Sequence, residues 1–595
     1  MTIPNSEGQE QIDLADYIFK RLVQLGLGSV HGVPGDYNLT ILDRVKPAGL
    51  TWVGNANELN AGYAADGYGR IKGIAAMCTS YGVGDLSAIN AIGGAYGEKS
   101  PIVHLVGTPL TAAQESGACL HHSLGDGNLR VFSDMNKWVT VAQANLIDVD
   151  TAPALVDATL KACVLNSRPV YIELPTNLVH AKVPAPTSPI DLSVPGYDEG
   201  HEAKVVASIV EAIHKVTKPV ILVGGLAARF GVTEEINEFV RLTGIPTVSM
   251  TFGKGIVNES LPNYQGVYIG AVGDAVLKQQ VDDADLILDF GPLHSDVNTF
   301  GFTAAPNADV TITIDQDSVK FFGQNPDASG RFFSPKSFMT KLLKSISATK
   351  LPTYPFNRGP SYPPHLLQNL KPSPDNAIID HDAFWLRMSE YLRSGDILIV
   401  EAGTAIAGAC TLILPDNVTF VNSGLWLSIG YTLPALQGAA LARREQRRDG
   451  SIKAMGSSGR SILFIGDGSL QMSVQGISDI IRNRLDATII VINNNGYTVE
   501  RYIHGFNESY NDIQPWRYTQ ALSFFGAPLD DPEYPVIAEQ AKNWGQLRSV
   551  LAREDVQRGK GLALIEVFMD LEDAPLPLKN FAVFMANRNR TNGKH

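Results

Sequence analysis

A strand–turn–helix–strand segment in the last third of the chain constrains the fold more than any other feature. In "ILFIGDGSLQMSVQGISDIIRNRLDATIIVINNNGYTVE" an apolar run, 462–465, ends in Gly-Asp-Gly-Ser, and a second, 488–492, ends in Asn-Asn-Asn-Gly-Tyr. A helical pattern lies between the two runs. Strands joined by a right-handed crossover end at the same edge of a parallel sheet, where open α/β sheets bind ligands. We therefore expect these two turns to form a ligand site.

The two turns supply oxygen ligands and free backbone N–H groups. Asp467 offers a charged oxygen and Asn494 a neutral one, a pairing that suits Mg²⁺ or Ca²⁺ better than softer metals. The glycines let the backbone approach a diphosphate, and a helix beginning near Ser469 would point its N–H groups at the same place. An Asp-Gly turn alone is common. The whole segment predicts a diphosphate bridged by magnesium.

The rest of the chain also alternates short apolar runs with amphipathic helical patterns, which predicts parallel sheets covered on both faces. Two proline-rich passages, 183–201 and 351–376, are typical of linkers and leave three segments of ordinary domain size. We expect an α/β fold of three domains, each a doubly wound, mostly parallel sheet. The basic, Gly/Ser-rich stretch 443–461 is expected to be an exposed flexible loop.

Composition excludes several classes of function. The formal net charge is -13, and Lys and Arg form no strong stripe, which argues against nucleic-acid and anionic-membrane partners. The N-terminus has no basic region followed by an apolar stretch, and no 18 apolar residues run uninterrupted. The four cysteines lie far apart, as expected of reduced thiols. We expect an intracellular, soluble protein that resides in the cytoplasm.

The two-turn segment and "WVGNANELNAGYAADGYGR" (52–70) together resemble the thiamine-diphosphate enzymes. The resemblance implies thiamine diphosphate and Mg²⁺ as cofactors, with Gly496 joining Asp467 and Asn494 at the metal. It also implies that Glu58 binds the pyrimidine ring and promotes formation of the reactive ylid. The expected domains are pyrimidine-binding (1–190), middle regulatory or scaffold (200–355) and diphosphate- and Mg-binding (375–575), followed by a tail (576–595).

Four further motifs resemble the 2-oxo acid decarboxylases of the fungal and bacterial pyruvate decarboxylase family, over residues 10–575. They are "HGVPGDYNL" with Asp36, "CLHHSLGDG" with His121 and His122, "NNNGYTVERYIHG" with Glu500, and "LWLSIGYT" with Ile429. The resemblance implies that these acids and histidines handle protons during decarboxylation through an enamine, and that Ile429 holds the cofactor bent. The residues expected to contact the cofactor are Glu58, Thr404, Leu427, Ile429, Asp467, Gly468, Ser469, Asn494, Gly496 and Val499.

The family resemblance implies a homodimer or homotetramer with active sites between subunits, and leaves the substrate open. Pyruvate, converted to acetaldehyde and CO₂, is the leading expectation. Val499 and Val297 replace bulkier residues, so larger 2-oxo acids such as indolepyruvate, phenylpyruvate or branched-chain acids stay open as substrates. Leu427 stands where glycine is usual. The sequence also leaves room for an acetolactate-forming carboligase or a catalytically inactive binding subunit.

The adjacent histidines raise a separate question, whether they bind a metal. Neighbouring side chains rarely point at one ion, and the sequence shows no third ligand near them. We therefore expect His121 and His122 to act as acid–base partners of Asp36 and Glu500.

Overall fold

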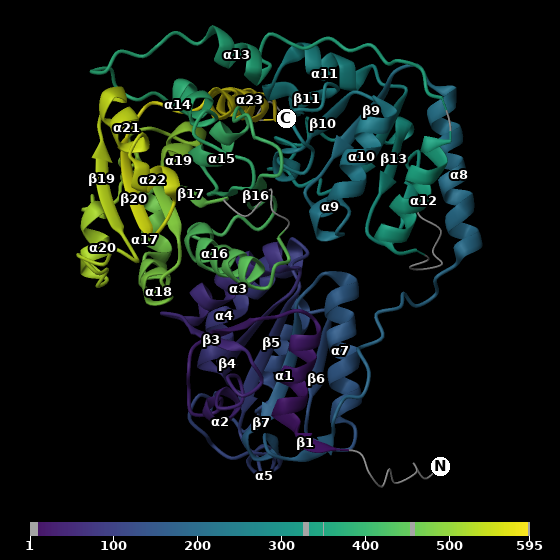
Figure 1. The fold of residues 1–595 in the computed structure, drawn as a ribbon, viewed down its shortest axis with the longest axis vertical. Coiled ribbons are helices and arrows are strands. Elements are labelled where there is room, and N and C mark those ends of the chain that lie inside the picture. The colour runs from purple at the N-terminus through teal and green to yellow at the C-terminus, as the bar shows by residue number, and fades with distance from the viewer. Residues whose placement is uncertain (1–9, 325–332, 349, 453–458, 593–595) are drawn as a thin grey trace. The chain divides into compact units, whose positions relative to one another are not determined.

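A computed structural model describes residues 10–324, 333–348, 350–452 and 459–592, and divides into two compact units. The first unit comprises residues 1–193 and Gln437–Arg448, and the second comprises Val194–Leu436 and Asp449–His595. The described residues form three six-stranded sheets and one two-stranded sheet, β1-β8. Figure 1 shows helices packed against the larger sheets. The predicted α/β class is confirmed.

The first unit contains a parallel sheet in the order β3-β2-β4-β5-β7-β6. Successive strand residues face opposite sides. Ala76 and Cys78 of β4 therefore pack with the core under α1 and α7, while Met77 between them approaches Gly62 of α3. The elements of the first unit up to Pro184 are β1 (Gln11–Asp13), α1 (Leu14–Gln24), β2 (Ser29–Gly32), α2 (Leu39–Leu42), β3 (Thr51–Gly54), α3 (Glu58–Lys72), β4 (Ala75–Ser80), α4 (Val83–Gly97), β5 (Ile102–Thr108), α5 (Thr111–Glu115), α6 (Val131–Asn136), β6 (Ala142–Asn145), α7 (Ala152–Asn166), β7 (Val170–Pro175) and β8 (Lys182–Pro184).

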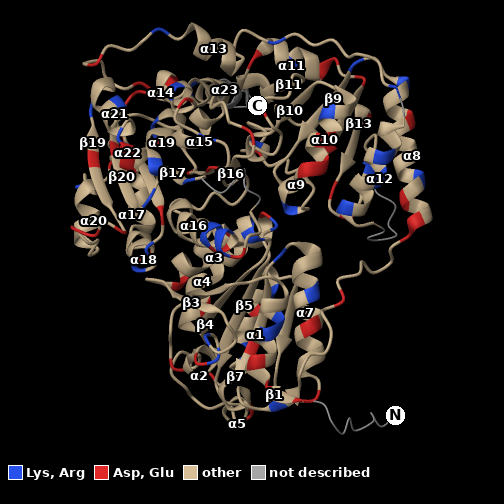
Figure 2. Cartoon of the chain, in the orientation of Figure 1, with Lys and Arg blue, Asp and Glu red and all other residues tan. Residues whose placement is uncertain are grey.

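The second unit contains two sheets, the first in the order β11-β10-β9-β12-β13-β14, with only β14 antiparallel to its neighbour. Acidic and basic residues both occur along its helix α8, whereas the charged residues of α12 are all lysines (Figure 2). Lys341 Nζ of α12 lies 2.5 Å from Glu202 Oε2 of α8. The elements are α8 (Glu199–Lys215), β9 (Pro219–Val223), α9 (Leu226–Arg229), α10 (Thr233–Thr243), β10 (Thr247–Ser249), β11 (Tyr264–Val267), α11 (Ala275–Asp282), β12 (Leu286–Phe290), β13 (Thr311–Ile314), β14 (Val319–Phe321) and α12 (Pro335–Ser347).

The second sheet of this unit is wholly parallel, in the order β16-β15-β17-β18-β20-β19. The elements of this part of the chain are α13 (Pro363–Asn369), α14 (His381–Met388), β15 (Ile397–Val400), α15 (Thr404–Ala409), β16 (Thr419–Val421), α16 (Thr432–Arg448), β17 (Ser461–Gly466), α17 (Asp467–Ser473), α18 (Gly476–Arg482), β18 (Ala487–Asn493), α19 (Thr498–Ile503), α20 (Ala521–Phe524), β19 (Val536–Ala541), α21 (Trp544–Leu551), α22 (Glu554–Arg558), β20 (Leu562–Phe568) and α23 (Leu576–Asn592). Of these, α16 from Gln437 onward belongs to the first unit.

The expectation of an exposed loop over 443–461 is wrong at both ends of the stretch. Helix α16 continues to Arg448, and within it Arg443 and Glu445 are buried. Arg460 is also buried, and its Nη2 lies 2.7 Å from Asp396 Oδ2. Ion pairing and hydrogen bonding make burial of these charges possible. Residues 453–458 lie outside the described residues.

The C-terminal stretch 576–595 contains helix α23 through Asn592. The N-terminal segment of the first unit ends at Ser193, within the proline-rich passage 183–201. The domain boundaries drawn from the sequence remain predictions. Within the described residues, we find no helix whose length and apolar composition would carry it across a membrane.

Candidate active site

Asp467 and Asn494 lie at the shared edge of two neighbouring strands. Strands β17 and β18 pair in parallel, with Gly466 opposite Ile492, so their C-terminal turns meet. The Asp467 side chain is buried; its Oδ1 accepts a hydrogen bond from the Gly468 N–H (2.8 Å) and its Oδ2 from the Gly496 N–H (3.1 Å). The three predicted metal ligands therefore lie together. The crossover that joins the strands begins with two short helices, α17 and α18, where one helix was expected.

The amide of Asn494 shows that this cluster fits a hard cation. One terminal atom of that amide lies 3.2 Å from Asp467 Oδ1 and 3.1 Å from the Gly496 carbonyl oxygen, while the other lies 2.8 Å from Thr498 Oγ1. Without a cation, the amide nitrogen must occupy the position near Asp467 and Gly496, because only the nitrogen can donate hydrogen bonds to their two oxygens. With a cation bound among these groups, the Asn494 amide oxygen can occupy that position instead. The oxygens of Asn494, Asp467 and the Gly496 carbonyl then converge, and Mg²⁺ prefers such oxygen ligands.

Burial adds a reason for a cation at this edge. The loss of solvation raises the pKa of Asp467 to about 6, although hydrogen bonds from the Gly468 and Gly496 N–H groups act in the opposite direction. A buried carboxylate is costly unless an opposite charge accompanies it. A divalent cation would supply that charge.

The predicted diphosphate contacts surround the same edge. Gly468 cannot be replaced without a shift, since a Cβ there would lie 2.5 Å from the Tyr497 ring. Ser469 lies in the first turn of α17, and Thr404 is the buried first residue of α15. A Cβ on the neighbouring Gly403 would lie 3.6 Å from Val499, so Val499 lies near the start of α15.

The loop with Leu427 and Ile429 packs against α17. The Gly430 carbonyl oxygen accepts a hydrogen bond from Ser473 Oγ (2.5 Å), and Ile429 is 39% exposed. Leu427 has φ +52°, a left-handed conformation that favours glycine. The loop therefore keeps the backbone conformation of a glycine although a leucine stands there.

Sequence reasoning missed Glu401, a buried carboxyl at the end of β15. Its Oε1 accepts a hydrogen bond from the Ala402 N–H (2.9 Å), and its Oε2 accepts from Thr432, so it joins β15 to the end of the Leu427–Tyr431 loop. Burial raises the pKa of Glu401 to about 7, against the effect of these hydrogen bonds. The sequence did contain a signal for Glu401, because in "DILIVEAGT" a single acidic residue directly follows an apolar strand, at the sheet edge where ligands bind.

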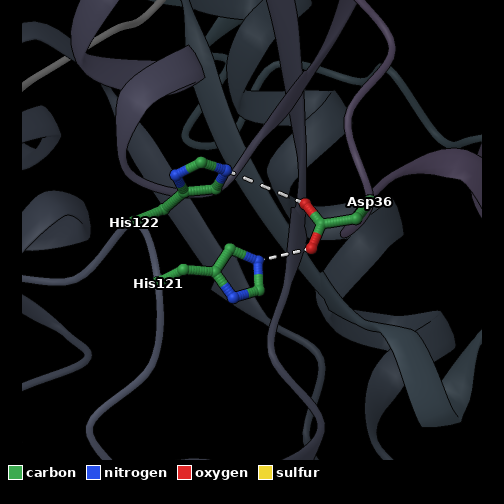
Figure 3. A group of neighbouring side chains, drawn as sticks. All are labelled: Asp36, His121 and His122. Atoms are coloured by element: carbon green, nitrogen blue, oxygen red, sulfur yellow. Dashed lines mark hydrogen bonds and ion pairs between the residues drawn. The ribbon is translucent and has the colours of Figure 1, made fainter.

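In the first unit, Asp36 brings the two adjacent histidines together (Figure 3). His121 Nε2 contacts Asp36 Oδ2, and His122 Nε2 lies 3.9 Å from Asp36 Oδ1. Adjacent side chains rarely point at one group, but both imidazoles of this pair face the Asp36 carboxylate. A φ of +64° at His122 turns the backbone so that both rings face the carboxylate.

Two residues missed by sequence reasoning hold this cluster in place. The Tyr37 ring stacks on His121 with centroids 4.9 Å apart and planes 7° apart. Gly82 has φ +73°, and a Cβ there would clash with the His122 carbonyl oxygen, so only glycine fits beneath the loop. Tyr37 directly follows Asp36 in "GDYN", and this position beside a predicted site residue was the signal in the sequence that could have identified it.

Glu58 and Glu500 are each the first-turn acid of a helix. Glu58 begins α3 and is half-buried, with Oε1 3.3 Å from the position of a Cβ on Gly84. Glu500 is exposed in the first turn of α19. Glu58 lies in the first unit with Asp36 and the histidines, whereas Glu500 lies in the second with Asp467. Their expected roles remain predictions.

Comparison with known proteins identifies the family. Three domain models of thiamine pyrophosphate enzymes match: the N-terminal TPP binding domain at 12–127, the central domain at 206–342 and the C-terminal TPP binding domain at 404–557. The chain belongs to the thiamine pyrophosphate enzyme family, whose cofactor is thiamine diphosphate with Mg²⁺ as its usual metal.

Within that family, the chain is similar to fungal proteins named pyruvate decarboxylase. It is 43% identical to the one from Aspergillus parasiticus (95% of this chain, 96% of the relative) and 42% identical to the one from Aspergillus fumigatus (99% of each). It is 38% identical to pyruvate decarboxylase isozyme 2 of Saccharomyces cerevisiae (97% and 99%). The family resemblance drawn from the motifs is confirmed.

Proposed function

We propose that this chain is a lyase that catalyses the non-oxidative decarboxylation of a 2-oxo acid, with pyruvate as the main substrate and acetaldehyde and CO₂ as products. The observation that carries the proposal is the contact of both imidazoles with the Asp36 carboxylate. Releasing an aldehyde requires a proton to be delivered after CO₂ has left. A carboxylate beside two histidines can hold and pass on that proton.

The cofactor supplies an electron sink for the carbon that loses CO₂. Asp467, Asn494 and Gly496 would hold the Mg²⁺, and Gly468 and Ser469 at the start of α17 would hold the diphosphate. Thr404, Leu427, Ile429 and Val499 would contact the rest of the cofactor. The converging oxygens around Asn494 support the metal assignment.

The acids of the chain would divide the proton transfers. Asp36, held by His121 and His122, would keep a proton available at the substrate side, with Tyr37 fixing the first ring. Glu500 would orient the substrate carboxylate from the first turn of α19. Glu58, at the start of α3, would hydrogen-bond the aminopyrimidine ring of the cofactor and raise its basicity.

Larger 2-oxo acids are a second candidate class of substrate. Val499 is one methylene smaller than isoleucine, a difference worth roughly 1 kcal/mol in substrate discrimination. Val297, another small residue where a bulky one is common, is 41% exposed in the single chain. The names of the fungal relatives favour pyruvate.

The assembly and location are part of the same proposal. Residues assigned to one cofactor lie in both units of the chain, and we propose that they meet between subunits of a homodimer or homotetramer in the cytoplasm. Sedimentation of the protein with and without thiamine diphosphate and Mg²⁺ tests the assembly. A monomer that turns over at full rate would contradict it.

One assay tests the reaction. The purified protein is incubated with thiamine diphosphate, Mg²⁺ and a panel of 2-oxo acids, and CO₂ and aldehydes are measured. Acetaldehyde from pyruvate is expected. Larger aldehydes alone would move the proposal to the second substrate class, whereas acetolactate or the absence of any product would overturn it.

A further inference from the structure

The Asp36–His121–His122 cluster has the composition and spacing of a metal site distinct from the magnesium site. One ligand atom from each side chain can be chosen so that all three lie within 4.8 Å of one another. Protein ligands of a tetrahedral zinc ion lie about 2.0–2.2 Å from it, and so about 3.4 Å from one another. Side-chain rotation alone could close the remaining gap, because the longest ion-pair distance here is 3.9 Å, from His122 Nε2 to Asp36 Oδ1.

The cluster is reachable and already ordered. The side chains of Asp36, His121 and His122 are 52%, 56% and 34% exposed in the single chain. Tyr37 stacks on the His121 ring and meets the His122 ring edge-on, with centroids 4.9 and 6.2 Å apart. The left-handed backbone at His122 keeps both Nε2 atoms on the carboxylate. An arriving ion would therefore meet ligands that need little reorganisation.

The chemistry of the ligands separates this cluster from the Asp467–Asn494 site. Imidazole nitrogens favour zinc, copper, iron, cobalt and nickel, whereas all-oxygen sites favour magnesium and calcium. Two histidines and one carboxylate leave open positions on a metal, as in catalytic zinc sites with three protein ligands. The two sites should therefore select different ions from the same solution.

We infer that Asp36, His121 and His122 bind a divalent transition-metal ion of the Zn²⁺ class, and that the bound ion blocks the enzyme. Binding follows from the cluster alone. Inhibition rests on the proposed function, because an ion bound to all three side chains removes the groups that would pass protons to the substrate. Micromolar Zn²⁺ should therefore inhibit in the presence of millimolar Mg²⁺, and 2-oxo acid should protect.

Equilibrium dialysis of the holoenzyme against Zn²⁺, with thiamine diphosphate and millimolar Mg²⁺ present, tests the site by elemental analysis. We expect close to one Zn²⁺ per chain. His121→Ala, His122→Ala and Asp36→Ala should each weaken Zn²⁺ binding at least tenfold. Because the three side chains are partly exposed, circular dichroism should show each variant folded.

Two controls locate the ion. The exposed His180 also pairs with an aspartate, the buried Asp13, with Nδ1 3.0 Å from Asp13 Oδ2, and His180→Ala should leave Zn²⁺ binding unchanged. Asp467→Asn should also keep it, which excludes exchange at the magnesium site. Zn²⁺ binding that survives the three cluster variants, or that is lost only in Asp467→Asn, would overturn the site.

The activity assay separates failure of the inference from failure of the proposed function. If Zn²⁺ binds at the cluster but no 2-oxo acid is decarboxylated, the site stands and the proposed function fails. If pyruvate is decarboxylated and Zn²⁺ neither binds nor inhibits below about 100 μM, a concentration that fills even a zinc site of modest affinity, the inference fails alone.

Discussion

The carboxylate of Glu401 accepts hydrogen bonds from both the hydroxyl and the backbone N–H of Thr432, at 2.6 and 3.3 Å. Glu401 directly follows strand β15, and Thr432 begins helix α16 directly after the loop with Leu427 and Ile429. A buried acid thereby fixes one end of a loop assigned to the cofactor.

Replacing Glu401 should remove a pH-dependent contribution to stability. Burial raises the pKa of Glu401 from 4.5 to about 7, so the native state holds its proton over a range in which the unfolded chain releases it. The contribution is therefore full below pH 4.5 and is lost as pH rises through about 7. The thermal midpoint of Glu401→Gln should therefore fall less than that of the wild type as pH rises through about 7. The exposed Glu390→Gln is the control, and identical pH profiles for both variants would contradict the prediction.

Replacing Leu427 by glycine should cost little stability. A non-glycine residue in the left-handed conformation carries about 1–2 kcal/mol of backbone strain, and glycine at the same position relieves it. Glycine also makes the unfolded chain more flexible, which lowers the free energy of unfolding by about 0.5–1 kcal/mol. Leu427→Ala keeps the strained φ and loses the side chain. The free energy of unfolding measured in urea should therefore be higher for Leu427→Gly than for Leu427→Ala. The reverse order would show that the backbone strain at this position is negligible.

Replacing Gly82 by alanine should displace the two histidines. The new Cβ would clash with the His122 carbonyl oxygen. Displacing reacting groups by about 1 Å can cost roughly 100-fold in rate. Gly26→Ala is matched, because Gly26 also has positive φ but no atom within 4 Å of the new Cβ. Decarboxylation of pyruvate should fall far more in Gly82→Ala, and equal rates would remove the loop from the mechanism.

Breaking the ion pair between Arg460 and Asp396 should destabilise the parallel sheet around β15 and β17. The Arg460 and Asp396 side chains are 2% and 0% exposed, and Asp396→Ala would leave the arginine buried without its partner. Such losses cost roughly 3–5 kcal/mol. The control, Glu554→Ala, breaks an exposed pair with Arg558 and should cost less than about 1 kcal/mol. Chemical unfolding distinguishes them.

Local patterns were enough to predict strands β17 and β18 and the approach of Asp467 to Asn494, because alternation of strands and helices fixes where parallel strands end. They were not enough for α16. Glu445 of that helix accepts a hydrogen bond from Ser29, 416 positions away, and such a partner leaves no trace near 443–461. The backbone of Leu427 and His122 was missed for a related reason, since only packing holds a non-glycine residue at positive φ.

The cysteines carry a practical consequence. Cys78, Cys163 and Cys410 are buried, whereas Cys119 is exposed two residues before His121. A maleimide fluorophore should therefore attach to the native chain at Cys119, beside the Asp36–His121–His122 cluster, and its emission should follow the arrival of ligands there without any engineered labelling site.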